Sequence, residues 1–474
     1  MNDIVSLNLE DQIGLLETKK ISSYELTTLY LENIKENKDL NCFISVNEDA
    51  LEQAKVIDNL KDRQSSVQGI PIAHKDIFCV KGHRTTCGSK MLENFISPYS
   101  STVFEKLENS KTIMLGKTNM DEFAMGSSNE TSFFGKVKNP INPLKSPGGS
   151  SGGSAAAVKA NLCAFATGTD TGGSIRQPAS FCGITGIKPT YGRVSRWGMI
   201  AFASSLDQAG IFAKSALDSA IALEIISGFD EKDSTSINSK VPNLKEETTS
   251  KMEHSIGVPM QIIEKIEDVN VKNNFLESIK ILEKNGFKTK QIELPFLEYS
   301  LPSYYVIAPA ECSANLSRYD GIKFGYRCDN PKDLEDLYVR TRSEGFGEEV
   351  KKRILIGTYC LSAGYFDAYY IKAQKIRAMI TESFKNAFKD VSVIAMPTCS
   401  NGAFELGSIQ DPVKMYEQDI YTIPANLAGL PAISIPSGNT EEMPLGLQFI
   451  GNHLEEGKIL NISHQFQKLT DYHV

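Results

Sequence analysis

The sequence has no apolar run that approaches the roughly 18 to 20 residues of a membrane-spanning helix. Its first residues, Met-Asn-Asp-Ile-Val, have neither the basic start nor the apolar stretch of a secretory signal, and they lack the Arg- and Ser-rich texture of an organelle transit peptide. We therefore expect a cytoplasmic protein with no membrane contact.

Paired cysteines are also missing. The nine cysteines are scattered along the chain and form no Cys-x-x-Cys pair and no Cys/His cluster with the spacing of a zinc site. We expect unpaired, inert thiols in a reducing cytosol and no bound metal.

An excess of basic charge is absent as well. The 50 Lys and Arg residues are outnumbered by 58 Asp and Glu, which gives a net charge of −8. This net negative charge argues against a protein that binds nucleic acid over its whole surface. It is compatible with a tRNA that is bound mainly by a partner. Because 41% of the 474 residues are hydrophobic, the chain can bury a sizeable core, and disorder is excluded as its main state.

The pattern along the chain predicts an α/β fold in which buried strands alternate with charged helices. We expect a mainly parallel or mixed sheet within a single domain that spans residues 1–474. The polar stretch 230–250 predicts a surface loop. Strands are predicted at 69–73, 393–396, 432–436 and 445–450, and helices at 7–37, 270–290 and 332–390.

Residues 126–192 are rich in glycine, with 12 glycines in 67 positions. Glycine at this density indicates tight turns and close approach of backbone segments. Within this part we expect a helix that starts at Ser154, a buried strand over 162–167 and a turn over Gly168–Ser174.

The run Ser146–Ser154, Ser-Pro-Gly-Gly-Ser-Ser-Gly-Gly-Ser, admits several interpretations. Its composition fits a flexible linker. A phosphate-binding loop would need a Lys before the final Ser, which is absent. Gly149–Gly153 matches the Gly-x-Ser-x-Gly nucleophile elbow, but no downstream histidine lies in a motif-like setting. Asp170-Thr-Gly imitates an aspartic protease triplet, of which the chain has no second copy.

The residue types also suit serine-based acyl transfer with a lysine base. A serine hydroxyl is a weak nucleophile that needs a base, and lysine can take the place of histidine. Lys75 follows an apolar run, where burial would favour the neutral amine that accepts a proton. The alternative is that Lys75 forms a structural ion pair with Asp76 or another carboxylate.

Ser174 ends a glycine-rich turn whose backbone is open on one face. The N–H groups of Thr171, Gly172 and Gly173 could converge there on an oxyanion, with Asp170 bonding within the turn. Ser150 would then relay a proton between Ser174 and Lys75.

Three segments, Gly69–Asp76, Gly148–Ser154 and Gly168–Pro178, together resemble the amidase signature family, and Gly148–Pro189 matches it almost residue by residue. The resemblance implies an amidase signature fold, a central mixed β-sheet covered by helices on both faces, with the signature core at about 69–210. It also implies the catalytic residues: Lys75 as the base, Ser150 as a relay serine preceded by a cis peptide bond, and Ser174 as the acylated nucleophile.

Further segments resemble one branch of that family, the glutamine-hydrolysing A subunits of tRNA-dependent amidotransferases. The most specific is Arg340–Ile354, which generic amidases lack and which lies in a helical segment at about 310–390. The resemblance covers residues 8 to 460. The other segments that carry it are Met120–Gly126, Lys188–Gln208 and Ser313–Gly321.

This second resemblance implies partners and a reaction. Glutamine would be hydrolysed through a serine acyl-enzyme, and the ammonia would pass through a tunnel to a B-type subunit. That partner would use ATP and Mg²⁺ to amidate Glu-tRNA(Gln) or Asp-tRNA(Asn), and it would contribute most of the tRNA binding. A small C-type subunit would complete a heterotrimer, and this chain itself would hold no cofactor.

The same resemblance implies the glutamine-binding residues. Arg353 would hold the carboxylate of glutamine, Asp419 its ammonium group, and Tyr305, in preference to Tyr304, would line the pocket. Without the resemblance, each of these residues would be interpreted as an ordinary surface ion-pair partner or a core aromatic. Two other functions stay open: a stand-alone amidase for small amides, and a non-catalytic scaffold that kept the fold.

Overall fold

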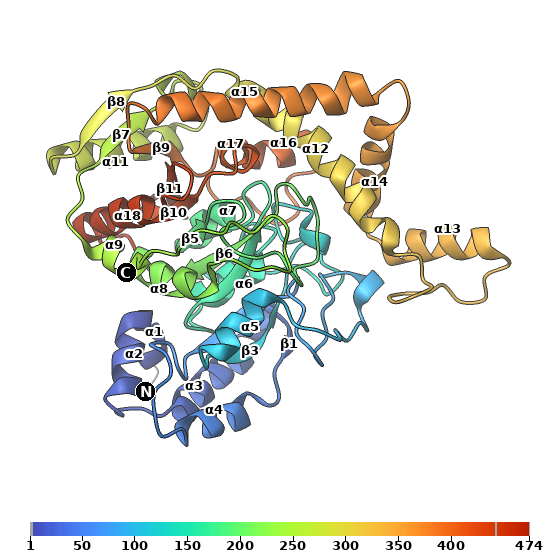
Figure 1. The fold of residues 1–474 in the computed structure, drawn as a ribbon, viewed down its shortest axis with the longest axis horizontal. Helices are drawn as coiled ribbons and strands as arrows, with labels where there is room; N and C mark the ends of the chain where they lie inside the picture. Colours follow the sequence, from blue (N-terminus) through green and yellow to red (C-terminus); the bar gives the residue numbers. More distant parts are fainter. Residues whose placement is uncertain (1–2, 441–442, 474) are drawn as a thin grey trace.

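A large mixed β-sheet runs through the whole molecule in the computed structural model, which describes residues 3–440 and 443–473 (Figure 1). The strand order in the sheet is β1-β3-β2-β4-β6-β5-β10-β11-β9-β7-β8. The strands are β1 (Phe43–Val46), β2 (Pro71–Lys75), β3 (Ile113–Thr118), β4 (Ala166–Asp170), β5 (Thr185–Lys188), β6 (Gln208–Ala213), β7 (Ser255–Val258), β8 (Lys288–Gln291), β9 (Val393–Pro397), β10 (Ala432–Asn439) and β11 (Pro444–Gly451).

The two ends of the sheet contain its parallel pairs. β2 pairs parallel with β3 and with β4, and β7 pairs parallel with β8 and with β9. The strands between them, and the edge pair β1–β3, are antiparallel. The predicted mixed sheet is therefore confirmed.

Helices cover both faces of the sheet, as expected for this fold class. α8, α9 and α18 pack against one another on one face, and α6 and α7 pack together on the other, where α11 also lies. The larger helices are α2 (Leu9–Glu17), α3 (Ser23–Glu36), α4 (Ala50–Asp58), α5 (Thr102–Asn109), α6 (Gly152–Lys159), α7 (Arg176–Cys182), α8 (Ala216–Ile226), α9 (Leu244–Thr249), α11 (Val269–Lys284), α12 (Ser300–Asn315), α13 (Leu334–Gly345), α14 (Glu348–Leu361), α15 (Lys372–Ala387) and α18 (Glu456–Thr470). The shorter ones are α1 (Asp3–Ser6), α10 (Met260–Ile263), α16 (Pro412–Tyr416) and α17 (Ile423–Leu427).

Local sequence accounts for several of these boundaries. The Ser22 hydroxyl accepts the Glu25 N–H and the Glu25 carboxylate accepts the Ser22 N–H, which is a complete capping box at the start of α3. α3 then buries Leu26, Tyr30 and Ile34, a spacing of four residues that places all three on one helix face.

The glycine-rich part differs from its prediction at one strand. The apolar residues 162–165 form a buried turn after α6, and β4 begins at Ala166 and includes Gly168, which the sequence pattern assigns to the following turn. Antiparallel pairing of β4 with β6 decides this boundary, and it brings the Phe212 ring so close to Gly168 that a Cβ there would lie 2.5 Å from the ring. The prediction for 230–250 is also incomplete, because α9 occupies 244–249 and packs on α8 and α18.

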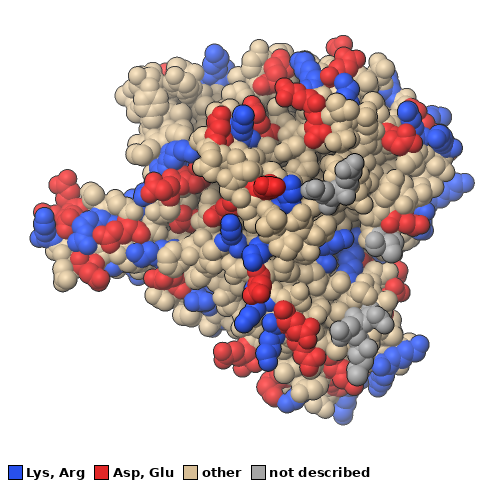
Figure 2. Space-filling model, turned by 180° about the vertical axis from the view of Figure 1, so that it is seen from behind, with Lys and Arg blue, Asp and Glu red and all other residues tan. Residues whose placement is uncertain are grey.

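The surface and the thiols agree with the composition. On the face drawn in Figure 2, Lys and Arg side chains are intermixed with Asp and Glu. All nine cysteines are unpaired and buried. No helix among the described residues is long and apolar enough to cross a membrane.

Candidate active site

Lys75 is the last residue of β2 and is completely buried. Its Nζ lies 2.8 Å from Ser150 Oγ, 2.8 Å from Ser151 Oγ and 2.7 Å from Thr169 Oγ1. No carboxylate among the described residues lies within ion-pair distance of it. Burial lowers the pKa of Lys75 to about 7, although nearby carboxylates oppose the shift. A substantial fraction of the amine is therefore neutral near pH 7.

The alternative ion pair between Lys75 and Asp76 is wrong. The Asp76 carboxylate instead accepts hydrogen bonds from Lys117 Nζ, at 2.8 Å, and from Thr86. Because successive side chains leave a strand in opposite directions, the neighbour that pairs with Lys117 cannot also face the hydroxyl cluster around Lys75.

The run Ser146–Ser154 is buried and its last three residues begin α6, so the linker interpretation is wrong. The peptide bond between Gly149 and Ser150 is cis. The Gly149 N–H donates to Gln177 Oε1 at 2.9 Å, and the Ser150 carbonyl accepts the Asp121 N–H at 3.1 Å. These bonds hold Ser150 against Lys75, and α6 starts directly afterwards at Gly152.

The turn after β4 presents unused N–H groups. The backbone N–H groups of residues 171–174 donate to no other described residue, which leaves them available to an oxyanion. The Thr171 hydroxyl donates to Asp207 at 2.7 Å, and the Gly172 carbonyl accepts from Thr422 Oγ1 at 2.6 Å. Both contacts connect the turn to segments far away in the sequence.

Ser174 lies at the end of this turn and is 8% exposed. Its hydroxyl makes no hydrogen bond to Ser150, to Lys75 or to any other described residue. The structure thus joins Lys75 to Ser150 directly and leaves the hydroxyl of Ser174 free at the edge of the turn.

Asp170 and Arg176 form a fully buried ion pair beneath the turn, at 2.9 Å. The Asp170 carboxylate also accepts the N–H of Ile175. Burial acts to raise the pKa of Asp170, but Arg176 more than offsets it and the pKa falls to about 2. Asp170 therefore bonds within the turn, as expected, and it stays ionised there.

The three residues expected to bind glutamine lie near the turn, on elements far apart in the sequence. Arg353, on α14, is buried and donates from Nε to Glu349 at 2.9 Å, while its two Nη groups donate to no described residue. Its guanidinium lies 5.4 Å from the Tyr305 ring and 5.6 Å from the Tyr416 ring. A planar guanidinium with two unused N–H edges suits a carboxylate.

Asp419 lies beside the turn itself. A Cβ on Gly173 would lie 3.2 Å from its Oδ1, and its Oδ2 accepts from Ser127 Oγ at 2.6 Å. Burial raises the pKa of Asp419 to about 7, against the opposing effect of Ser127 and Arg353. No ion pair within 4.0 Å joins Asp419 to Arg353 in the described ranges, so a carboxylate oxygen and a guanidinium edge both remain free.

Tyr304 and Tyr305 contact different parts of the site. The Tyr304 ring is buried against the turn, where a Cβ on Gly172 would lie 2.8 Å from its Oη. Tyr305 faces Arg353 and stacks on Tyr416 at 4.0 Å between ring centroids. Tyr304 therefore borders the turn and Tyr305 borders the guanidinium.

Sequence reasoning missed several residues that complete the site. Ser151 and Thr169 contact Lys75 Nζ, and Asp121 and Gln177 hold the Ser150 loop. One signal was present for Thr169: Thr167 and Thr169 alternate on β4 and therefore share one face, and Thr167 Oγ1 accepts the Lys75 N–H at 3.2 Å.

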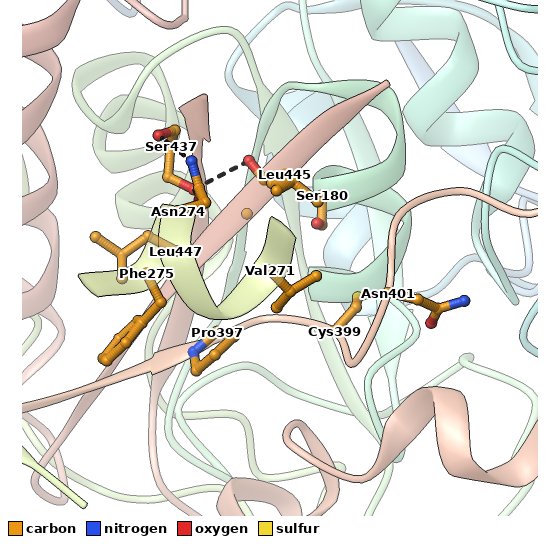
Figure 3. A pocket seen from close by; sticks show the side chains of 11 residues that line it. Ser180, Val271, Asn274, Phe275, Pro397, Cys399, Asn401, Ser437, Leu445 and Leu447 are labelled. Carbon is orange, nitrogen blue, oxygen red and sulfur yellow. Dashed lines mark hydrogen bonds between the residues drawn. The ribbon is translucent and has the colours of Figure 1, made fainter. Parts of the chain in front are cut away.

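Other hollows lie away from this constellation. Figure 3 shows one between α11 and the strands β9, β10 and β11, where Asn274 faces Ser437; none of the candidate catalytic residues lines it. Over residues 3–440 and 443–473, no group of three His, Cys, Asp or Glu side chains is arranged to hold a metal ion.

Comparison with known proteins gives a consistent result. The Amidase family model matches residues 25–460. The chain is 57% identical to the A subunit of glutamyl-tRNA(Gln) amidotransferase from Ruthia magnifica subsp. Calyptogena magnifica, over 96% of each chain. It is 41% identical to the A subunit of the same enzyme from Thermotoga maritima, whose crystal structure matches with a TM-score of 0.81 over 98% of this chain and 95% of the other. Native peptide amidase from Stenotrophomonas maltophilia is 26% identical, with a TM-score of 0.82 over 98% and 97%.

Proposed function

The chain belongs to the amidase family and, within it, to the A subunits of glutamyl-tRNA(Gln) amidotransferase, and from this premise we propose that it hydrolyses glutamine to supply ammonia for tRNA-bound glutamate. The observation that carries the proposal is the 2.8 Å contact between Lys75 Nζ and Ser150 Oγ. Lys75 is buried there and forms no ion pair with a carboxylate of the described residues. A lysine whose pKa burial lowers to about 7 is a competent base near neutral pH.

The proposed reaction begins with attack of Ser174 Oγ on the side-chain amide carbon of glutamine. The hydroxyl proton passes to Ser150, whose own proton passes to Lys75. The tetrahedral oxyanion is held by the N–H groups of Thr171, Gly172 and Gly173, which donate to nothing else in the described chain.

Collapse of this intermediate breaks the C–N bond, and the amide nitrogen leaves as ammonia with the proton that Lys75 returns through Ser150. Water then attacks the acyl-enzyme and gives a proton through Ser150 to Lys75. Lys75 returns this proton to the Ser174 oxygen as the ester bond breaks, so glutamate is released and the Ser174 hydroxyl is restored. The residues thus serve both half-reactions, as general acid–base catalysis requires.

Glutamine is proposed to bind by its two charged ends. The free Nη edge of Arg353 suits the α-carboxylate, and the free Oδ1 of Asp419 suits the α-ammonium. The ammonium would also keep Asp419 ionised, since an adjacent positive charge lowers the pKa that burial raises to about 7. Tyr305 would pack against the Arg353 guanidinium at the carboxylate end.

The remaining parts of the proposal concern the assembly. We propose that the chain works in the cytoplasm as one component of a heterotrimer with B-type and C-type partners. The B-type partner would use ATP and Mg²⁺ on the mischarged tRNA, and this chain would need no cofactor of its own. Glu-tRNA(Gln) is the substrate named for the relatives; Asp-tRNA(Asn) would be accepted through the same ammonia supply.

The test is glutamine hydrolysis by the purified chain, alone and with B-type and C-type partners, ATP and mischarged Glu-tRNA. We expect low activity alone and a strong rise in the complex. Full activity alone, indifferent to partner and tRNA and broad over simple amides, would instead identify a stand-alone amidase. A Ser174→Ala chain that kept its activity in the complex would point to a non-catalytic scaffold.

A further inference from the structure

Two of the segments that resemble the amidotransferase branch, Met120–Gly126 and Arg340–Ile354, meet through a single buried carboxylate. Glu122 is 3% exposed, and its Oε2 accepts the Gly347 N–H at 2.8 Å while its Oε1 accepts from the Ser89 hydroxyl. Gly347 is the residue that precedes the first turn of α14, and it has no side chain with which to cap the helix. Glu122 therefore satisfies the N–H of the N-cap residue from a distant part of the chain, as the glutamate of a capping box does locally.

The fit between these two residues is close. A Cβ on Gly347 would lie 2.3 Å from Glu122 Oε2, so the carboxylate occupies the space that any side chain at 347 would need. The next residue, Phe123, packs its ring 5.7 Å from the Phe346 ring. A carboxylate and an aromatic ring from adjacent residues thus hold both residues that lead into α14.

Asp121, the residue before Glu122, contacts the loop that carries Ser150. The Asp121 N–H donates to the Ser150 carbonyl at 3.1 Å, and a Cβ on Gly149 would lie 2.0 Å from Asp121 Oδ2. Asp121 and Glu122 are adjacent, so one peptide unit separates the support of the Ser150 loop from the support of α14. Five residues later, Ser127 donates to Asp419.

α14 carries Arg353 in its first half and packs closely on α12 in its second half. The helix lies so close to α12 that a Cβ on Gly357 would fall 1.9 Å from the Pro309 carbonyl oxygen. Arg353 lies within the second turn after Gly347 and is itself buried. Arg353 thus lies on the half of α14 that the contact between Glu122 and Gly347 holds, and the position of the helix start sets where its guanidinium lies relative to the turn that ends at Ser174.

We propose that Glu122 is a positioning residue for glutamine: it fixes the start of α14, and through α14 the Arg353 guanidinium, at a set distance from the catalytic loop. This inference rests on the proposed function, because it takes Arg353 as the group that binds the α-carboxylate. It assigns Glu122 to substrate recognition and leaves the chemistry to Lys75, Ser150 and Ser174.

The test is steady-state kinetics of Glu122→Ala in the assembled enzyme, with glutamine and with propionamide, a neutral amide that has no α-carboxylate. Loss of a helix cap corresponds to roughly a fivefold to tenfold change in an equilibrium. We expect KM for glutamine to rise by about that factor with kcat nearly unchanged, and kcat/KM for propionamide to stay at the wild-type value.

Two further variants separate positioning from general damage. Glu122→Gln keeps an oxygen for the Gly347 N–H and a donor for Ser89, so it should recover most of the glutamine affinity. Gly347→Ala places a methyl group where the Glu122 carboxylate lies and so separates the two residues. It should raise KM as Glu122→Ala does. The matched control is Glu348→Gln, since Glu348 is in the first turn of the same helix but its side chain is 93% exposed.

Three results would overturn the assignment. An equal loss of activity on glutamine and propionamide would place Glu122 in support of the catalytic loop. An unchanged KM for glutamine in Gly347→Ala would remove the link to Arg353, and this variant carries the test if Glu122→Ala does not fold. A wild-type enzyme that cleaves propionamide but not glutamine would overturn the proposed function itself.

Discussion

Thr169 Oγ1 accepts a hydrogen bond from Lys75 Nζ at 2.7 Å. Thr169 lies on β4, which pairs parallel with β2, the strand that ends at Lys75. A neutral amine has two protons and one lone pair, so one of the three hydroxyls around Nζ must donate to it. Ser151 donates its own proton to the Thr169 carbonyl at 3.1 Å. When Thr169 accepts from the amine as well, the lone pair is directed at Ser150.

The first prediction concerns this orientation. Thr169→Val removes an acceptor at nearly constant volume, and we expect kcat for glutamine to fall by roughly 10- to 100-fold with KM unchanged, because the lysine lone pair is no longer directed at Ser150. The acid limb of the pH–rate profile should also move to lower pH, since the ammonium form loses an acceptor. Thr169→Ser, which retains the hydroxyl, should remain within a few-fold of wild type.

A pH–rate profile of Thr169→Val that coincided with the wild type would contradict this role, even if kcat fell. Thr28→Val serves as the matched control, because its hydroxyl donates to the Tyr24 carbonyl within α3, away from the site.

The second prediction is the pH dependence of Lys75 itself. Only the neutral amine accepts a proton, so glutamine hydrolysis should rise as the pH passes through about 7, the value to which burial lowers the lysine pKa. Lys75→Met should reduce kcat by about a thousandfold or more. A flat acid limb in the wild type would exclude Lys75 as the base.

Stability provides an independent measure of the same shift. The folded chain releases the Lys75 proton near pH 7, whereas the unfolded chain keeps it to the ordinary value of 10.5. The unfolded state therefore binds more protons between these values, and this group makes the free energy of unfolding increase with pH there. The stability of Lys75→Met relative to wild type should fall from pH 7 to pH 10, as measured by urea unfolding. A constant difference would mean that the pKa of Lys75 is not lowered.

The residues proposed to be catalytic could be found in the sequence, whereas most of the residues that hold them in place could not. Lys75, Ser150 and Ser174 lie in short motifs whose residue types carry their chemistry, and the predicted strand before Lys75 is β2. The prediction misplaces β4 because the start of this strand is decided by pairing with β6 rather than by its own apolar residues. Local pattern is a weak guide where tertiary pairing decides the conformation.

The contact of Glu122 with Gly347, near the residues proposed to bind glutamine, could not be predicted from local sequence pattern either. The two residues are 225 positions apart, and neither forms a local pattern that predicts the other. A glycine before an acidic first turn is an ordinary helix start, and a buried glutamate next to Asp121 has no visible partner in the sequence. Resemblance to a family identified both segments, whereas only the folded chain shows that they touch.

The third prediction concerns the ion pair beneath the turn. Arg176 is completely buried and donates to Asp170, to Gln448 and to the Thr422 carbonyl. Arg176→Met leaves the Asp170 carboxylate buried without its partner, and we expect a loss of about 3 to 5 kcal/mol in the free energy of unfolding. Urea unfolding at pH 7 measures it, and the exposed lysine of the Lys55–Glu52 pair, changed in Lys55→Met, is the control that should behave as wild type.

The same pair sets an acid limit. The folded pKa of Asp170 is about 2, below its ordinary 3.8, so its stabilising contribution is present above pH 4 and is lost as the pH falls toward 2. Arg176→Met should lose much of this acid dependence. A variant with wild-type stability at pH 7 would show that the pair contributes nothing beyond the packing of the two side chains.

The last prediction concerns Gly173, whose φ is +147°, in the turn over residues 171–174 that we propose to bind the oxyanion. A Cβ there would meet Thr422 Oγ1 at 2.2 Å and Asp419 Oδ1 at 3.2 Å, so Gly173→Ala must displace the turn and the N–H groups it presents. We expect kcat for glutamine to fall by roughly 100- to 1,000-fold, the range for loss of one oxyanion donor. Gly82→Ala is the matched control, since Gly82 also has a positive φ, +78°, but a Cβ there meets no atom within 4 Å. It should unfold at a lower urea concentration and keep its activity, because only backbone strain is added. If Gly173→Ala and Gly82→Ala retain equal activity, the oxyanion must be held by groups other than the N–H groups of this turn.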